Sequence, residues 1–562
     1  MDEIATRRQQ LELRHPVWEP MSLSARFDAV AEEYGDRSYV ITDERSYSYA
    51  EMREWSRRLA RGLIALGVQA GDHVALVIDN RPEFVPVKLA IARVGAVAVP
   101  LNYSYRARDL TAALAKSDAT VLITIDASMA TDFLVTLDGL IPGWEDGAVS
   151  DELPRLRRVV LVPSGTRAGA FDLEALAALG DEGGEEELLA REGALRADDL
   201  CDLVFTSGTT GHAIGVMLTH DMVLRSAYGS AYSRAFFDGW RIGFSLPLYH
   251  VFGYIEGLLA VLFVGGAVVP HRVFSPRTTL ETIERHRVNE VLFVPTMSVA
   301  VVEQATKQSY DLSSLESVFS AAAPAPVRLW ERVQQELRPR TVATGYGQTE
   351  VSAATALTQP GDPLITVSET VGCCKLGGVA ATEGMNGRLA EYRTVDPFTG
   401  EPLLAGEEGE LSVRGPIVTR GYYNEPERTA QLIDAEGWLR TGDLGHIRED
   451  GYLQLTGRSS ELFKVGGELV APKEIEDLLT QHPSIEQAFV AGVGDERMGQ
   501  VGCAWVVLTE GAALTEREII RHCSEQLAPF KVPREIRFLA VEELPMTTTG
   551  KVQKYELVAR RS

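Results

Sequence analysis

Cysteine is scarce in this sequence and follows no recognisable spacing. The 562 residues include five cysteines, and the two nearest neighbours, Cys373 and Cys374, are adjacent rather than spaced as C-x-x-C. An odd number without that spacing does not fit a disulfide framework and gives no cysteine-based metal site. We therefore expect reduced thiols and a cytoplasmic protein.

Long apolar runs and basic patches are also missing. The longest apolar stretch, residues 257–270, has about 14 residues and two internal glycines, whereas a bilayer span needs roughly 20 residues. The polar N-terminus lacks the apolar core of a signal peptide. A net charge of −24 repels nucleic-acid backbones and acidic lipids, and no basic patch compensates. We expect no nucleic-acid partner, no membrane span, and a monomer or homodimer.

The apolar residues that are present follow an α/β pattern. Helical patterns alternate with short apolar runs, with helices expected at 49–66 and 81–94 and strands at 73–78, 96–100, 119–124 and 158–162. Short strands separated by helices predict parallel sheets that are covered by helices. At roughly 150 residues per domain, the length predicts three to four compact units.

Three regions depart from this pattern. Residues 168–199 are acidic and rich in Ala, Gly and Glu, which we interpret as a solvated surface excursion. After Gly387, short alternating strands and many turns predict a small β-rich subdomain. The last hundred residues return to a mixed pattern, with a helix at 473–481 and strands at 487–493 and 503–508, and they predict a separate small domain.

A loop of small polar residues stands between two apolar runs within residues 202–220. Its residues are Thr206, Ser207, Gly208, Thr209, Thr210 and Gly211. The backbone N–H groups of such a loop can surround a polyphosphate, so the pattern predicts a nucleotide loop. It is not the G-x-x-x-x-G-K-[ST] loop, because neither glycine is followed by the required lysine and hydroxyl residue. An ordinary polar hairpin is the alternative interpretation.

Five stretches of the chain occur in an informative order. They are residues 206–211, 346–350 and 438–443, then Gly457-Arg458 and Gly550-Lys551. In order and rough spacing they resemble the adenylate-forming superfamily, in particular the acyl- and aryl-CoA synthetases, with relatives among nonribosomal-peptide adenylation domains and beetle luciferases. The resemblance extends from about residue 23 to residue 558.

The resemblance implies both a domain layout and a reaction. The layout is a large N-terminal domain, residues 1–457, made of αβαβα parallel-sheet subdomains with the β-rich subdomain at about 387–457. A small mobile α+β domain, residues 458–562, follows a hinge near 458–460. The implied enzyme joins a carboxylic acid to the α-phosphorus of ATP, releases pyrophosphate, and passes the acyl group of the acyl-AMP to CoA. Positioning and charge stabilisation would then carry the catalysis.

The same resemblance assigns the triphosphate site. Thr206, Ser207, Thr209 and Thr210 would hold the phosphates, with Gly208 and Gly211 completing the loop. Thr349 would meet the α-phosphate and Glu350 would bind Mg²⁺, an ion that prefers hard carboxylates and bridges phosphates. Lys551 would bridge the reacting carboxylate and the α-phosphate as a compact cation on a long stem.

The nucleoside and thiol sites are implied in the same way. Tyr346, between Gly345 and Gly347, would stack on adenine, with Ala322, Ala323 and Pro324 on the other side. Asp443 would accept hydrogen bonds from the ribose, and Arg458 would donate to it. After rotation of the carboxyl domain, Lys464, Gly466 and Gly467 would close a channel for the pantetheine arm of CoA. These assignments make ATP, Mg²⁺ and CoA the expected cofactors and co-substrates.

His250 lies in a stretch that the resemblance places beside the acyl pocket and thiol tunnel. We favour a gating or pocket-lining role, and a satisfied core histidine is the alternative. No Ser/His/Asp nucleophile arrangement or G-x-S-x-G elbow makes it a triad base. Apolar and small residues nearby predict a roomy, uncharged pocket for an aryl, alicyclic or medium-chain acid; they are Phe244, Leu246, Val251, Phe252, Ala353, Ala354 and Ala356.

The sequence also departs from the family pattern. Where relatives have proline and lysine after the phosphate loop, this chain has Ala213 and Ile214, and Ser460 stands at a hinge position that is commonly Asp or Lys. Losing one charge-assisted phosphate contact costs on the order of 1.5 to 3 kcal/mol, which predicts a weakened enzyme. Two alternatives remain: a nucleotide-binding pseudoenzyme, and an acyl-AMP ligase that loads an acyl carrier protein.

Overall fold

The computed structural model describes residues 3–148, 150–163, 165–207, 213–495, 497–509, 511–546 and 552–561. Its first sheet has six strands in the order β6-β5-β3-β4-β7-β8. The strands are β3 (His73–Val77), β4 (Val97–Pro100), β5 (Ala119–Ile125), β6 (Arg158–Val162), β7 (Leu200–Ser207) and β8 (Ala213–Thr219). All neighbours are parallel except β7 and β8. The predicted parallel sheet is therefore confirmed.

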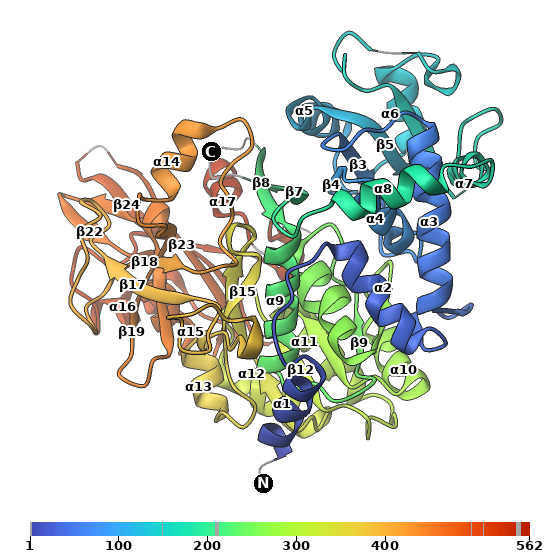
Figure 1. Cartoon of the computed structure of the whole chain (residues 1–562). Helices are drawn as coiled ribbons and strands as arrows, with labels where there is room; N and C mark the ends of the chain where they lie inside the picture. Colours follow the sequence, from blue (N-terminus) through green and yellow to red (C-terminus); the bar gives the residue numbers. More distant parts are fainter. Residues whose placement is uncertain are drawn as a thin grey trace.

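A second parallel sheet lies beside the first, and in Figure 1 the two occupy the right-hand part of the molecule. Its order is β13-β12-β11-β9-β10-β1-β2, and only β1 and β2 pair antiparallel. The strands are β1 (Ser38–Ile41), β2 (Ser46–Ser48), β9 (Arg241–Phe244), β10 (Ala267–Pro270), β11 (Glu290–Phe293), β12 (Ser317–Ser320) and β13 (Thr341–Ala343). Their runs of Val, Ile, Leu and Phe are buried, as expected for strands covered on both faces.

Helices cover both sheets. Those of the large N-terminal part are α1 (Glu3–Arg14), α2 (Leu23–Tyr34), α3 (Tyr49–Ala65), α4 (Phe84–Arg93), α5 (Ala107–Ser117), α6 (Phe133–Leu140), α9 (His220–Ser233), α10 (Pro276–His286), α11 (Pro295–Ala305) and α12 (Val327–Glu336). α3 begins where expected because Ser48 and Glu51 form a reciprocal capping box. The apolar run at 257–270 is buried, as predicted. It forms the end of a π-helix, η2 (Phe252–Leu259), then the 3₁₀-helix η3 (Ala260–Val264) and β10.

The acidic segment at 168–199 is solvated as expected at residues 181–187, which are all exposed, but it is not an irregular excursion. It forms α7 (Leu173–Asp181) and α8 (Glu185–Ala194), with Leu176 and Leu188 fully buried. Its acidic residues pair with arginines of α3: Arg58 Nη2 lies 2.5 Å from Asp181 Oδ2, and Arg61 Nη1 lies 2.8 Å from Glu185 Oε2. A few leucines on one face outweigh the acidic composition, and the carboxylates meet cations on α3.

Antiparallel strands occupy the other side of the molecule in Figure 1. A three-stranded sheet is formed by β14 (Gly345–Gln348), β15 (Ala353–Leu357) and β16 (Cys373–Cys374). A four-stranded antiparallel sheet follows, with β17 (Glu391–Val395), β18 (Gly409–Arg414), β19 (Leu439–Ile447) and β20 (Leu453–Arg458). Short helix α14 (Pro426–Leu432) belongs to this part, whereas α13 (Leu364–Glu369) packs against α12 and β13 of the second parallel sheet.

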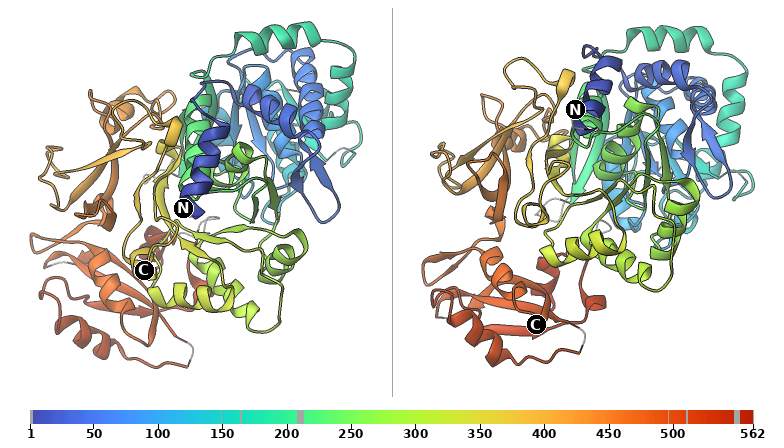
Figure 2. Two further views of the ribbon diagram at one scale, coloured as in Figure 1. Left: turned by 60° about the horizontal axis from the view of Figure 1, so that its bottom comes forward. Right: turned by 90° about the horizontal axis from the view of Figure 1, so that it is seen from below.

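The carboxyl-terminal residues build a sheet and a core of their own, drawn in red in Figure 2. The strands are β21 (Phe463–Val465), β22 (Glu468–Val470), β23 (Ile485–Asp495), β24 (Gly499–Leu508) and β25 (Glu535–Phe538). The helices are α15 (Pro472–Thr480), α16 (Glu516–Ser524) and α17 (Lys554–Ala559). Arg328 Nη2 of α12 donates a 3.2 Å hydrogen bond to Ile485 O, so this body contacts the large part of the chain.

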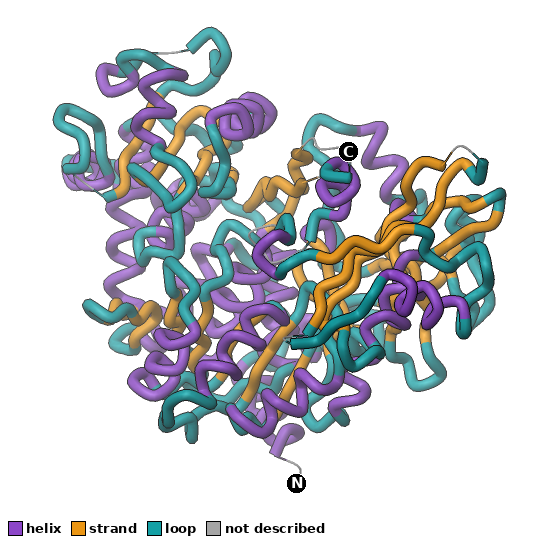
Figure 3. Tube along the Cα trace, turned by 180° about the vertical axis from the view of Figure 1, so that it is seen from behind, coloured by secondary structure: helices purple, strands orange, loops and turns teal. Residues whose placement is uncertain are grey.

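The secondary structure as a whole is mixed α and β, as the view from behind in Figure 3 shows. The α/β class that the sequence predicted is thus confirmed. Among the described residues, no helix combines the length and the apolar character needed to cross a bilayer.

Candidate active site

Tyr346, Asp443 and Arg458, which come from three different strands, meet in one hydrogen-bonded group. The Tyr346 hydroxyl donates to Asp443 Oδ2 at 2.6 Å, and Arg458 Nε lies 2.8 Å from Asp443 Oδ1. Asp443 and Arg458 face each other across β19 and β20, whereas Tyr346 comes from β14, about a hundred residues earlier in the chain. The fold thus brings together the residues that the motifs assigned to adenine and ribose.

Gln348 is part of the same group, and the sequence reasoning missed it. Its Nε2 donates to Asp443 Oδ2 at 2.9 Å and to Thr441 O at 2.7 Å, and lies 3.2 Å from the Tyr346 hydroxyl. Tyr346 and Gln348 are two residues apart on β14, so their side chains leave the same face of the strand. That spacing is the sequence signal that could have found Gln348.

β14 approaches its neighbouring strand very closely at Gly347. A Cβ atom added there would lie 1.7 Å from Ala353 O of β15, so only glycine fits. Ala322, which we assigned to the other side of the adenine, follows β12 with a φ of +75°. Ala322 therefore takes a left-handed conformation that is uncommon for a residue with a Cβ atom.

Glu350 is anchored by a second residue that the sequence reasoning missed, Tyr422. The Tyr422 hydroxyl donates to Glu350 Oε1 at 2.9 Å, and Thr419 N donates to Glu350 O at 2.7 Å. Burial raises the pKa of Glu350, and the hydrogen bond from Tyr422 and the charge of Arg458 oppose that shift. Glu350 and the buried Thr349 both lie in a short 3₁₀ turn, η4 (Thr349–Val351), directly after β14.

The segment that carries Tyr422 also pairs with β8. Met217 N donates to Gly421 O at 3.1 Å, and Tyr423 N donates to Gly215 O at 2.9 Å. The 417–423 segment therefore joins Glu350 to the second strand of the predicted nucleotide loop. The sequence offered no signal for this connection, because Tyr422 lies outside the five motifs.

A single carboxylate at this position suits Mg²⁺. Magnesium keeps several waters and is usually bound in proteins by one or two carboxylates together with substrate phosphates. Among the residues that the structure describes, no group of three or more His, Cys, Asp or Glu side chains could form an all-protein metal cage. Glu350 therefore fits the part of a protein ligand to a phosphate-bound ion.

The predicted nucleotide loop stands between β7 and β8, which pair antiparallel as the hairpin interpretation requires, and its role in nucleotide binding stays a prediction. Thr206 at the end of β7 pairs with Ile214 of β8, and Ser207 pairs with Ala213. Between them, Gly208, Thr209, Thr210 and Gly211 lie outside the described residues. Lys116 Nζ of α5 donates to Ala213 O at 3.1 Å, which places a cation at the base of the loop.

His250 stands in the turn before π-helix η2. Its Nδ1 accepts a 3.2 Å hydrogen bond from Phe252 N, and burial lowers its pKa to about 4. The ring is therefore neutral at pH 7 and carries its proton on Nε2. Asn80 fixes the same turn, donating to Leu246 O at 2.8 Å and accepting from Leu248 N at 2.9 Å.

The residues assigned to the thiol channel belong to the carboxyl-terminal sheet. Lys464 is exposed on β21, and Gly466 and Gly467, with φ of +60° and +97°, make the turn to β22. Lys551 lies outside the described residues. Lys554, three residues further on, lies 2.5 Å from Glu461 Oε2 and 2.8 Å from Glu476 Oε1, so α17 is tied to the residues that follow Arg458.

Comparison with known proteins supports the reading of these motifs. The family described as AMP-binding enzyme matches residues 27–423, and the AMP-binding enzyme C-terminal domain matches residues 474–551. A propanoyl:CoA ligase of Mycobacterium tuberculosis, whose acid carries a methyl-dioxo-octahydroindenyl group, is 35% identical over 536 residues, covering 95% of this chain and 98% of its own. The mitochondrial medium-chain acyl-CoA ligase ACSF2 of Danio rerio is 31% identical over 563 residues. The match covers 97% of this chain and 89% of the relative.

A solved structure is similar over nearly its whole length. The anthranilate CoA ligase AuaEII in complex with anthranoyl-AMP superimposes with a TM-score of 0.79 at 25% identity, covering 97% of this chain and 98% of that one. The fold and the ordered motifs thus agree with the resemblance seen in the sequence. This chain belongs to the family of AMP-binding enzymes within the adenylate-forming superfamily.

Proposed function

We propose that this protein is an AMP-forming ligase that joins an apolar carboxylic acid to CoA. The observation that carries this proposal is the convergence of Tyr346, Asp443 and Arg458 from β14, β19 and β20. An aromatic ring beside an acceptor-only carboxylate is suited to hold a nucleoside by its base and its ribose hydroxyls. Relatives that cover almost all of this chain are named as CoA ligases.

In the adenylation step the protein contributes position and charge. Asp443 would hold the ribose, and Glu350 would bind Mg²⁺, which would supply positive charge beside the phosphates. Thr349 and the hydroxyls of Thr206, Ser207, Thr209 and Thr210 orient the phosphates. Lys551 pairs with the attacking carboxylate and the α-phosphate. Fixing reactants and charges in this way lowers the barrier without a protein nucleophile.

The acid that we propose is aryl, alicyclic or medium-chain. Phe244, Leu246, Val251 and Phe252 surround the turn at His250, and all four are buried. The neutral His250 supplies no positive charge to a second carboxylate on the substrate. The related enzymes are named for a bicyclic propanoate, a medium-chain acid and anthranilate, which cover these three classes.

CoA is the acceptor that we propose for the second step. The carboxyl-terminal body, residues 458–562, would rotate about a hinge near 458–460 and exchange Lys551 for the face at Lys464, Gly466 and Gly467. The paired glycines of that face leave room for a thin pantetheine arm. An acyl carrier protein carries the same arm, so the assay must separate the two acceptors.

The test is an acid panel in two stages. Purified protein is assayed for acid-dependent exchange of labelled pyrophosphate into ATP with aryl, alicyclic, medium-chain and dicarboxylic acids, and the active acids are then incubated with free CoA. The proposal predicts exchange with at least one apolar acid and formation of its acyl-CoA. Silence with every acid would favour the pseudoenzyme suggested by Ile214. Exchange without acyl-CoA would favour a carrier-protein acceptor.

A further inference from the structure

Two neighbouring residues directly after Glu350 have a strained backbone. Ser352 and Ala353 have φ of +54° and +78°, in the left-handed region that residues with a Cβ atom rarely adopt. Two such residues in succession need surrounding contacts that hold them in place. They turn the chain from η4, which carries Glu350, into β15, so the direction of Glu350 depends on this bend.

Three hydrogen bonds, two made by Ser352 and one by Ala354, hold the bend in place. Ser226 Oγ of α9 donates to Ser352 O at 2.5 Å, and Ser352 Oγ donates to Ile417 O at 2.8 Å. On the far side of the bend, Ala354 N donates to Glu256 Oε1 at 3.1 Å. Each contact comes from a different part of the chain.

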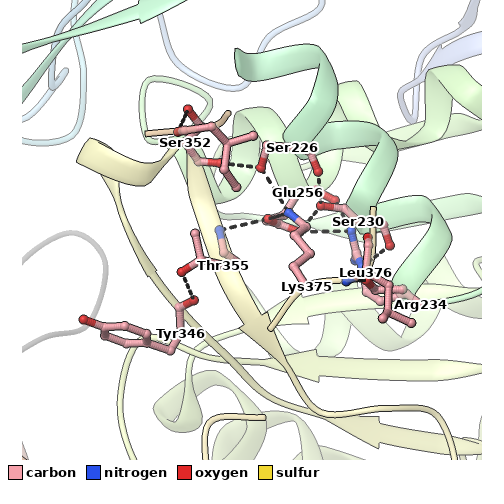
Figure 4. Close-up of polar contacts among 12 residues, drawn as sticks. Ser226, Ser230, Arg234, Glu256, Tyr346, Ser352, Thr355, Lys375 and Leu376 are labelled. Carbon is pink, nitrogen blue, oxygen red and sulfur yellow. Dashed lines mark hydrogen bonds and ion pairs between the residues drawn. The ribbon is translucent and has the colours of Figure 1, made fainter. Parts of the chain in front are cut away.

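Two of these contacts lead to one buried ion pair, shown in Figure 4. Lys375 Nζ donates to Glu256 Oε1 at 2.9 Å and to Ser226 Oγ at 3.0 Å. The side chains of Glu256 and Lys375 are 1% and 0% exposed, so water does not screen the pair. Glu256 thus holds the amide of Ala354 after the bend. Lys375 holds the carbonyl of Ser352 through Ser226.

The environment of Glu256 requires an ionised carboxylate. Its oxygens accept from Ala354 N and Lys375 Nζ, from Ser230 Oγ at 2.6 Å, and from Arg234 Nη2 at 3.4 Å. All four partners are donors, and only a carboxylate presents acceptors alone. A glutamine would turn its NH₂ group toward at least one of these donors, which would break part of the network.

We propose that Glu256 and Lys375 are positioning residues of the adenylation site, which hold the left-handed bend at Ser352–Ala353 and thereby direct Glu350. Glu256 comes from π-helix η2, which follows His250, so the pair also joins the acid-pocket turn to the ATP site. This inference rests on the proposed function, because it assigns Glu350 to the ATP site.

The first test is Glu256→Gln against Glu290→Gln. Glu290 is a buried carboxylate that pairs with the same Arg234, at 2.5 Å, but lies on β11, away from the bend. Burial raises the pKa of Glu290 to about 7, so glutamine resembles a form that it already populates. Glu256→Gln should lower kcat/KM in pyrophosphate exchange about 10- to 100-fold. Glu290→Gln should stay near wild type, and an equal loss in both would overturn the proposal.

A milder variant covers the case in which Glu256→Gln does not fold. Ser226→Ala removes the hydroxyl between Lys375 and Ser352 O and leaves the ion pair intact. Its control is Ser233→Ala on the same helix, whose hydroxyl bonds the backbone of Leu376 instead. Only Ser226→Ala should reduce pyrophosphate exchange, and equal activities in the two variants would contradict the proposal.

Relief of the strain should rescue the damaged enzyme. In the Glu256→Gln or Ser226→Ala background, Ala353→Gly should restore much of the lost kcat/KM, because glycine adopts positive φ without cost. Asn386, an exposed residue with a φ of +49°, provides the matched control. Asn386→Gly relieves a similar conformation elsewhere and should restore no activity. Equal effects of both glycines would show general stabilisation and would overturn the proposal.

Hydrogen exchange separates this inference from the proposed function. Glu256→Gln should speed amide exchange in a peptide covering residues 350–356, whereas Glu290→Gln should leave that peptide protected. This measurement needs no substrate, so it decides the role of the ion pair even if the wild-type chain is silent with every acid. Unchanged protection in Glu256→Gln would overturn the role of the pair, and silence with every acid would overturn only the proposed function.

Discussion

Tyr346 donates a 2.6 Å hydrogen bond to Asp443, and in doing so it joins the predicted adenine site to the predicted ribose site. Gln348 and Arg458 complete the set of donors around that carboxylate. In the site that we propose, a ribose hydroxyl must therefore enter a preformed group of hydrogen bonds. The orientation of Asp443 is set before the nucleotide arrives.

Removing the Tyr346 hydroxyl should separate two proposed roles of this residue: the orientation of Asp443 by the hydroxyl and the stacking of the ring on adenine. Tyr346→Phe keeps the ring but loses the bond to Asp443, so we expect the KM for ATP to rise roughly tenfold with little change in the KM for the acid. Tyr346→Ala should raise the KM for ATP further. Steady-state kinetics with each substrate varied would decide this. Equal KM values for wild type and Tyr346→Phe would contradict the role given to the hydroxyl.

Two adjacent tyrosines provide a matched pair of variants for testing the magnesium site that we propose at Glu350. The Tyr422 hydroxyl bonds Glu350, whereas the Tyr423 hydroxyl bonds Asp118 Oδ2 at 3.0 Å. Tyr422→Phe should raise the Mg²⁺ concentration needed for half-maximal pyrophosphate exchange about three- to tenfold, because Glu350 loses one of its anchors. Tyr423→Phe should leave it unchanged. A Mg²⁺ titration that shifts equally in both variants would show that the segment, and not the hydroxyl, matters.

Ile214 stands where the family pattern that this sequence resembles has a lysine expected to contact phosphate. Ile214→Lys should lower the KM for ATP by about one decade, because a charge-assisted contact is gained. Ile214 is 7% exposed, so the new side chain must extend its ammonium out of a buried position, and the melting temperature should fall slightly. Both expectations are tested by comparing the KM for ATP and the melting temperature of Ile214→Lys with those of the wild type. A KM for ATP that stays the same or rises would argue against this account of the loop.

Acid should destabilise the protein partly through His250. Burial lowers its pKa in the folded state to about 4, against an ordinary value of about 6.5 in the unfolded chain. Between these values the unfolded state binds more protons, so the free energy of unfolding rises with pH across this window. Urea unfolding at pH 5 and pH 7.5 should therefore show a smaller pH difference in His250→Gln than in wild type. An identical difference in both proteins would exclude His250 as a contributor.

The sequence predicted the parallel sheets well, because their strands are short apolar runs separated by helical periods. It predicted the convergence of Tyr346, Asp443 and Arg458 only through the resemblance to a family, since these residues lie far apart in the chain. Composition predicted the exposure of residues 181–187 but not the helices α7 and α8, which a few buried leucines fix against the rest of the fold.

Other parts of the site lay beyond the reach of sequence patterns. Glu256 and Lys375 are 119 positions apart, and neither lies in one of the five motifs. No local period marks an ion pair that forms only when π-helix η2 packs beside the residue that follows β16. Tyr422 likewise meets Glu350 across 72 positions. Such contacts depend on tertiary packing, which local propensity does not encode.

We propose that this chain makes an acyl-AMP and then transfers its acyl group to CoA. The most direct measurement is mass spectrometry of a single-turnover reaction with an acid active in pyrophosphate exchange, first with ATP and Mg²⁺ alone and then after adding CoA. The account predicts acyl-AMP in the first sample and its conversion to acyl-CoA and AMP in the second. An acyl-AMP that persists unchanged in the presence of CoA would contradict it.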